Sequence, residues 1–208
     1  MSQSLQPPTR PPRPGSVTVA VWLQILLAVA LVVSAIVGAV YGADAEAAFE
    51  AELASQGLEI ADLPDDSQND FGGGAGMYTT LVVALGLLTL GLLNGAGKRP
   101  ARIITWVIQP LVLVCGGFAF AGQLFLGPFL QWTFDNSGEE NLEALDAGAL
   151  VDAAFAAFPA WSVAVDWAVV LLATLGSLLV IILLAVPSAN AFFRKPEQRM
   201  DIPGAPPQ

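Results

Sequence analysis

Residues 159–186 have the sequence PAWSVAVDWAVVLLATLGSLLVIILLAV, an almost unbroken apolar run whose single charged residue is Asp166. The hydrocarbon core of a bilayer is about 30 Å thick, and an α-helix of roughly 20 apolar residues crosses it. The run therefore predicts a membrane-spanning helix over residues 163–187. An acid inside such a helix is a candidate functional residue, whereas an acid at its end is an ordinary interfacial charge.

The composition of the whole chain is that of a membrane protein. Of its 208 residues, 55 % are hydrophobic and only 12 % are charged, whereas soluble domains carry about 25 % charged residues. Three further apolar segments, residues 17–41, 77–94 and 103–127, are also long enough to cross a bilayer. The predicted fold is thus an all-α, four-helix transmembrane bundle, with residues 17–190 forming the membrane domain.

The basic residues predict the orientation of this bundle. All eight of them lie in the N-terminal tail (residues 1–16), in the link between the second and third spans, or in the C-terminal tail (residues 191–208). Cytoplasmic segments are enriched in Lys and Arg, so both termini are predicted to be cytoplasmic in a multi-pass protein of the cell membrane. The N-terminal tail is rich in proline and is predicted to be disordered, with a docking peptide for a cytoplasmic partner as the alternative.

The two remaining connections, residues 42–76 and 128–162, carry many acids and no basic residue, and each is predicted to contain a short extracytoplasmic helix. In the first, Asp44 is placed to cap a helix that ends near Gly57. In the second, Ser137 and Glu140 have the spacing of a capping box, and a helical apolar stripe continues to Pro159. We expect these acidic helices to pack on each other, on the mouth of the bundle, or on a partner.

The residue inventory excludes several kinds of chemistry. There is no histidine and only one cysteine, so a Ser/His or Cys/His nucleophile, a cysteine metal cage and an intramolecular disulfide are all ruled out. The acidic stretch at residues 62–70 lacks the glycine and glutamate positions of an EF-hand calcium loop. We therefore predict no catalytic, cofactor-binding or metal site. The net charge of −10 argues against nucleic acid as a partner.

Polar side chains in the predicted spans are few, and the candidates for a site are Gln24, Gln109, Gln123 and Asp166. Gln24 and Gln109 lie at similar depths and are expected to hydrogen-bond between helices. The alternative is that these side chains line a polar pathway. Counting about 20 residues back from the basic C-terminal end places Asp166 at the outer interface. Asp166 would face the bundle instead if its helix began earlier, near Pro159.

Small residues four apart predict where helices pack closely in a membrane. The alternative is that one of these faces serves a partner or a second copy. The four sets, one in each span, are Ala30, Ser34 and Gly38; Gly91 and Gly95; Gly117 and Ala121; and Ala173 and Ser177.

Two segments that enter the membrane from the predicted cytoplasmic side are alike. Residues 13–24 (RPGSVTVAVWLQ) and 99–109 (RPARIITWVIQ) each have Arg-Pro, an apolar run with a Trp, and a Gln at nearly the same position. The match predicts two similarly oriented hairpins from an internal duplication, with chance similarity of apolar sequence as the alternative. The Arg-Pro pair that follows the Pro-rich tail and the KRPARI turn resemble features of uncharacterised four-span membrane proteins of high-GC bacteria. The resemblance concerns layout and implies no activity.

These observations favour a non-catalytic multi-pass membrane protein: a scaffold, accessory subunit or envelope-associated interaction protein. Besides the lipid bilayer, its expected partner is another membrane protein or a second copy of the chain. The alternative is a small channel or transporter whose acidic loops concentrate cations at its mouth. No span carries a charge near its middle, which disfavours ion-coupled transport, and an enzyme is not expected.

Overall fold

The computed structural model describes residues 12–63 and 74–194. The described part of the chain is helical and contains no strand. Four stretches are long and apolar enough to cross a membrane: Gly15–Ser55, Gly76–Gly95, Arg99–Asp135 and Ser162–Ala185. The predicted all-α class with four candidate spans is therefore confirmed. Most of the Pro-rich tail, most of the acidic stretch at 62–70 and the C-terminal tail lie outside the described residues.

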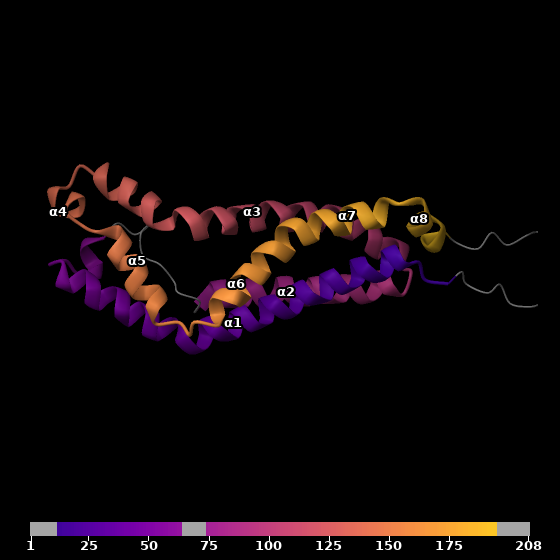
Figure 1. Ribbon diagram of the computed structural model, residues 1–208, viewed down its shortest axis with the longest axis horizontal. Helices are drawn as coiled ribbons and strands as arrows, with labels where there is room; N and C mark the ends of the chain where they lie inside the picture. Colours follow the sequence, from indigo (N-terminus) through magenta and orange to yellow (C-terminus); the bar gives the residue numbers. More distant parts are fainter. Residues whose placement is uncertain (1–11, 64–73, 195–208) are drawn as a thin grey trace, which may run out of the picture.

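The long helices α1, α2 and α3 run roughly along the long axis of the molecule (Figure 1). The fourth span is built from three successive pieces, because a π-helical turn interrupts it. The elements in chain order are α1 (Gly15–Ser55), η1 (Ile60–Asp62), α2 (Gly74–Gly95), α3 (Arg99–Asp135), α4 (Glu140–Glu143), α5 (Ala147–Ala156), α6 (Ser162–Leu171), the π-helical turn η3 (Leu172–Gly176), α7 (Ser177–Ala185) and α8 (Pro187–Phe193).

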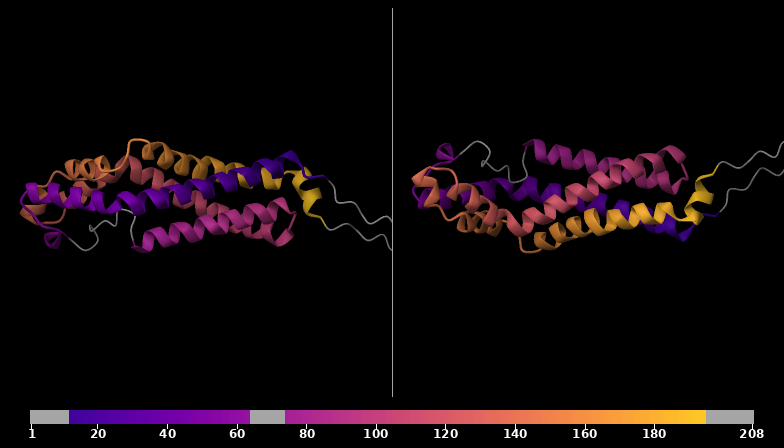
Figure 2. Two further views of the ribbon diagram at one scale, coloured as in Figure 1. Left: turned by 90° about the horizontal axis from the view of Figure 1, so that it is seen from below. Right: turned by 90° about the horizontal axis from the view of Figure 1, so that it is seen from above.

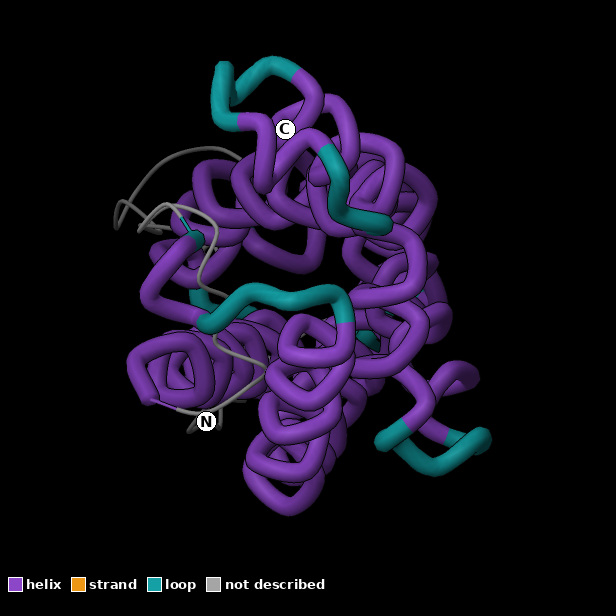
Figure 3. Tube along the Cα trace, turned by 90° about the vertical axis from the view of Figure 1, so that its left-hand side faces the viewer, coloured by secondary structure: helices purple, strands orange, loops and turns teal. Residues whose placement is uncertain are grey.

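Both ends of the described chain lie at the same end of the molecule, which we call the terminal end (Figures 1 and 2). The hydroxyl oxygens of Ser16 and Ser188 are 3.4 Å apart there. The link from α2 to α3 turns at this end too, as four antiparallel spans require. The opposite end, where α1 and α3 finish, is the head end. Figure 3 shows the molecule along its long axis, from the head end. In this view the described chain consists of helices that are joined by loops and turns.

Two of the helices extend far beyond the spans predicted from the sequence. α1 has 41 residues and α3 has 37, so at about 1.5 Å per residue each is about twice as long as the hydrocarbon core is thick. The prediction that Asp44 caps a separate helix is wrong, because α1 continues through this position without a break. The segment is rich in Ala and Glu, which are strong helix formers, and a lone Gly42 is not enough to stop it. Gly57 follows the helix end at a φ of 91°, as expected of a C-terminal glycine.

The capping box predicted at Ser137 and Glu140 is also wrong. Helix α4 does begin at Glu140, but its N-cap is Glu139, which makes no side-chain cap. The Ser137 hydroxyl instead accepts a hydrogen bond from the Glu139 backbone N–H at 3.2 Å. The cap of the following helix, α5, is Asp146, whose carboxylate accepts from the Ala149 N–H at 2.9 Å. The apolar stripe is thereby divided between two helices.

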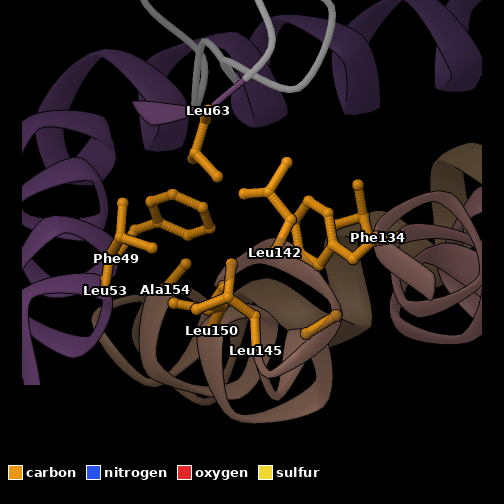
Figure 4. Close-up of a cluster of buried hydrophobic side chains, with 10 residues drawn as sticks. Phe49, Leu53, Leu63, Phe134, Leu142, Leu145, Leu150 and Ala154 are labelled. Carbon is orange, nitrogen blue, oxygen red and sulfur yellow. The ribbon is translucent and has the colours of Figure 1, made fainter. Parts of the chain in front are cut away.

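At the head end the chain forms a small helical unit that we call the head. This unit has a hydrophobic core of its own (Figure 4). It joins the extended ends of α1 and α3 to η1, α4 and α5. Two glutamines tie its parts together: Gln56 Oε1 accepts from the Asp146 N–H at 2.8 Å, and Gln131 Oε1 accepts from the Ala147 N–H at 3.0 Å. The core residues are Phe49, Leu53, Leu63, Leu130, Phe134, Leu142, Leu145, Ala147, Leu150 and Ala154.

Helices α3 and η3 cross very closely at a glycine. A Cβ atom added to Gly116 would lie 2.7 Å from the Cβ of Ala173, which is too close for any side chain. Gly117, which the sequence marks as a small packing residue, does not lie in this contact, because a Cβ at Gly117 meets nothing within 4 Å. Adjacent residues differ by about 100° around a helix, so a pattern of small residues in a run of two glycines identifies the contact only to within one position.

Candidate functional site

Five buried polar side chains join all four spans at one level of the bundle. They are Gln24 from α1, Asn94 from α2, Thr105 and Gln109 from α3, and Ser177 from α7, and each is at most 1 % exposed. We call this group the polar cluster. It contains two of the four candidate residues that the sequence singled out.

Hydrogen bonds run through the polar cluster from helix to helix. The Asn94 amide donates to Gln24 Oε1 at 3.1 Å and to Thr105 Oγ1 at 2.8 Å. The Gln24 amide donates to Gln109 Oε1 at 3.4 Å, and the Gln109 amide donates to Ser177 Oγ at 2.8 Å. Because a buried polar group costs free energy unless it is paired, these bonds fix how the spans are rotated and shifted relative to one another.

The local sequence explains how the cluster forms. Gly91, one turn before Asn94 in α2, brings that helix against α1: a Cβ at Gly91 would lie 3.4 Å from the Gln24 Cβ. Thr105 and Gln109 are four residues apart, so they lie on the same face of α3. Among the described residues, Asn94 Oδ1 is the one buried side-chain polar atom without a hydrogen-bond partner.

Apolar side chains pack on both sides of the polar cluster along the bundle. Towards the terminal end, the core contains Val17, Ala20, Val21, Val180, Leu184, Ala189 and Phe193. Towards the head, it contains Leu27, Ala28, Leu87 and Ala173. The cluster has hydrogen-bond donors and acceptors but no titratable group, and its side chains are buried. Its chemistry is therefore that of an internal crosslink between helices.

The other two candidates, Gln123 and Asp166, lie elsewhere. They line a lateral pocket of about 480 Å³ just below the head, together with Ser34 of α1, Phe155 of α5 and further residues of these helices and α6. Gln123 is exposed and Asp166 is half-buried. Helix α6 begins at Ser162, so Asp166 lies in its second turn. The four candidates thus form two separate pairs, one buried in the bundle and one lining an open pocket.

Three residues of the polar cluster were not among the sequence candidates. Thr105 could have been found from its four-residue spacing to Gln109, and Ser177 had been noted only as a small packing residue. Asn94 stands at the predicted end of its span, where a polar residue is unremarkable on sequence grounds. Its pairing with Gln24, 70 positions away, depends on how α1 and α2 are rotated and leaves no local signal.

No protein-family model, curated protein or solved structure matches this chain. The resemblance to four-span proteins of high-GC bacteria therefore stays a prediction.

Proposed function

We propose that this chain is a non-catalytic multi-pass protein of the cell membrane that presents the head outside the cell as a scaffold, accessory subunit or envelope-associated interaction protein. The observation that carries the proposal is the head itself. Helices in bundles are usually joined by about 2–8 residues, whereas here two long connections and the ends of α1 and α3 build a packed core of their own. A unit of that kind provides a surface beyond the membrane.

The distribution of charge supports this orientation. The basic residues of the described chain, Arg13, Lys98, Arg99, Arg102 and Arg194, all belong to the terminal end. Since basic segments stay in the cytoplasm, both termini are cytoplasmic in this proposal and the head is extracytoplasmic. The bundle closed by the polar cluster then serves as a rigid base for the head.

The surface of the head favours a partner with basic groups. Within its described residues there is no Lys or Arg, and eleven of its acids are exposed: Asp44, Glu46, Glu50, Glu59, Asp62, Asp135, Glu139, Glu140, Glu143, Asp146 and Asp152. Opposite charges steer association and like charges oppose it. A membrane-protein partner with a basic extracytoplasmic surface therefore fits the head better than a second copy does, and a homo-oligomer would have to form through the spans.

The proposal is tested by crosslinking in native membranes and identification of the proteins that co-purify with the full chain. Wild type is compared with E139Q/E140Q/E143Q, which neutralises acids on and beside α4, and with R13Q/K98Q, which changes charge only at the terminal end. We expect one recurring partner that is retained by R13Q/K98Q, weakened in the head variant and released by salt. Repeated recovery of lipid and the chain itself alone would contradict the proposal.

A second candidate function, a small channel or transporter, has one observation in its favour. Asp166 and Gln123 line an open pocket beside the acidic head, where cations would gather. Against it, the buried polar cluster and its apolar neighbours lie between this pocket and the terminal end and contain no charged group that could bind a cation in the bundle. If proteoliposomes with the wild-type protein took up cations and those with Asp166→Asn did not, transport would replace the scaffold as the function. An equal cation leak in wild type, Asp166→Asn and empty vesicles would rule transport out.

A further inference from the structure

A basic pocket of about 520 Å³ lies at the terminal end, between the start of α3 and the end of α8. Three arginines line it, Arg99, Arg102 and Arg194, and none of its lining residues is acidic. It is separate from the polar cluster and from the pocket at Asp166. We call it the arginine pocket.

Two of the arginines are held in place by neighbouring groups. The Arg102 guanidinium donates to Asn190 Oδ1 and lies over the rings of Trp106 and Phe193, 5.8 Å and 5.3 Å from their centroids. The Arg99 Nε–H donates to the Phe193 carbonyl oxygen at 2.6 Å. The hydrogen bonds orient both guanidinium groups before any ligand arrives, and the aromatic rings hold that of Arg102 further in place.

The charge of the pocket has no counterion within the described residues. Arg99, Arg102 and Arg194 form no ion pair there with any carboxylate of residues 12–63 or 74–194. A guanidinium has five N–H donors, and Arg99 and Arg102 each give one to the protein in the bonds above. Three like charges around one cavity repel one another, so an anion with several acceptor oxygens would relieve the repulsion and satisfy the free donors.

We propose that the arginine pocket binds the phosphate of an anionic phospholipid. Guanidinium groups match phosphate oxygens in a bidentate fork, and basic pockets at the ends of membrane helices are suited to anionic headgroups. The pocket wall continues along α3 as an apolar surface, with Ile103 67 % and Trp106 45 % exposed. An acyl chain would lie on that surface, which a water-soluble phosphate would leave bare. The inference does not depend on the proposed function of the head.

Native mass spectrometry of the delipidated full-length protein in neutral detergent tests the ligand. The probes are phosphatidylglycerol, phosphatidylcholine, which has the same phosphate but no net charge, and inorganic phosphate. We expect phosphatidylglycerol to bind about tenfold more tightly than phosphatidylcholine. A tenfold difference in affinity is what one weakened charged hydrogen bond would cause. Equal binding of both lipids would overturn the proposal. Displacement of phosphatidylglycerol by millimolar inorganic phosphate would assign the pocket to a soluble phosphate compound and overturn the lipid assignment.

A matched pair of variants tests the residues. R99Q/R102Q removes two positive charges from the pocket, and R13Q/K98Q removes two from the same end of the molecule outside it. We expect at least a tenfold loss of phosphatidylglycerol binding in R99Q/R102Q and less than a twofold change in R13Q/K98Q. If both double variants lost the same amount of phosphatidylglycerol binding, the binding would depend on the general surface charge of this end, and the proposed site would be wrong. R102K keeps the charge but loses the planar fork, so it should bind with intermediate affinity even if R99Q/R102Q fails to fold.

Discussion

The amide nitrogen of Gln24 in α1 lies 3.4 Å from Oε1 of Gln109 in α3, deep inside the bundle. These two glutamines end the matching segments at residues 13–24 and 99–109, so the two segments meet at equal depth in the bundle. Both begin a long helix, of 41 and 37 residues, which is followed by a shorter span of 20 or 24 residues. The two hairpins share one layout. An internal duplication stays a prediction, because packing alone can also produce such a pairing.

Replacing Gln109 by Leu should destabilise the bundle. The change removes both bonds of Gln109, to Gln24 and to Ser177, and leaves Ser177 and the Gln24 amide buried. Hydrogen bonds between membrane helices contribute about 0.6 kcal/mol on average and up to about 1.7 kcal/mol, so we expect a loss of about 1–2 kcal/mol. The measurement is the free energy of unfolding in a denaturing detergent titration.

The control for this experiment is Gln123→Leu, because Gln123 is exposed and lies outside the polar cluster. It should change stability by less than about 0.5 kcal/mol. The double variant Gln24→Leu/Gln109→Leu should cost less than the sum of the single variants, since their shared bond is lost once. Strict additivity would show that the two glutamines do not interact energetically.

Gly116 and Gly117 form a natural pair for testing the close crossing of α3 and η3. Gly116→Ala places a methyl group 2.7 Å from the Ala173 Cβ and 3.0 Å from its backbone carbonyl carbon, so the helices must separate. Overpacking of this kind costs about 1–3 kcal/mol. Gly117→Ala meets nothing within 4 Å and should be neutral or slightly stabilising. Thermal stability in detergent, followed by size-exclusion chromatography, distinguishes the two, and equal stabilities would contradict this crossing.

Truncating Phe134 should open the head without disturbing the spans. Phe134 is 1 % exposed and packs in the core of the head, and Phe→Ala changes at such positions cost about 3–5 kcal/mol. Hydrogen exchange should therefore rise in α4, α5 and the end of α1 but stay unchanged around the polar cluster. Phe155→Ala is the control, since Phe155 is 50 % exposed. If exchange rose equally along the whole chain, the head would not be a separate cooperative unit.

Single cysteines report the orientation directly. The background is Cys115→Ala, which removes the chain's only native thiol. In this background a single cysteine replaces either Ser137, which follows α3, or Ser188 in α8, and both serines are exposed. Because the head is expected outside, a membrane-impermeant maleimide should label Ser137→Cys in intact cells. It should label Ser188→Cys only after the cells are permeabilised. The reverse pattern would invert the proposed topology.

The course of the two acidic connections at the head end shows where sequence patterns stopped being informative. Their helical character follows from local composition, and the stop near Gly57 was predicted correctly. The unbroken path of α1 through Asp44, and the capping of α5 by Asp146 rather than a box at Ser137, were not predicted. A capping residue competes with continued helix, and at Asp44 the Ala- and Glu-rich segment continues the helix, which places Phe49 and Leu53 of α1 in the core of the head.

The sequence by itself determined the number of spans and the difference in charge between the two ends. Both are properties of consecutive residues: apolar length must match a bilayer, and basic residues gather between or beside particular spans. Only the tertiary structure decided which side chains meet. It brought Gln24 to Asn94 and Gln109, turned Gly116 rather than Gly117 towards Ala173, and separated Asp166 from the polar cluster. The reason is that the rotation of each helix about its axis is set by its neighbours, and apolar residues around the whole circumference leave that rotation unspecified.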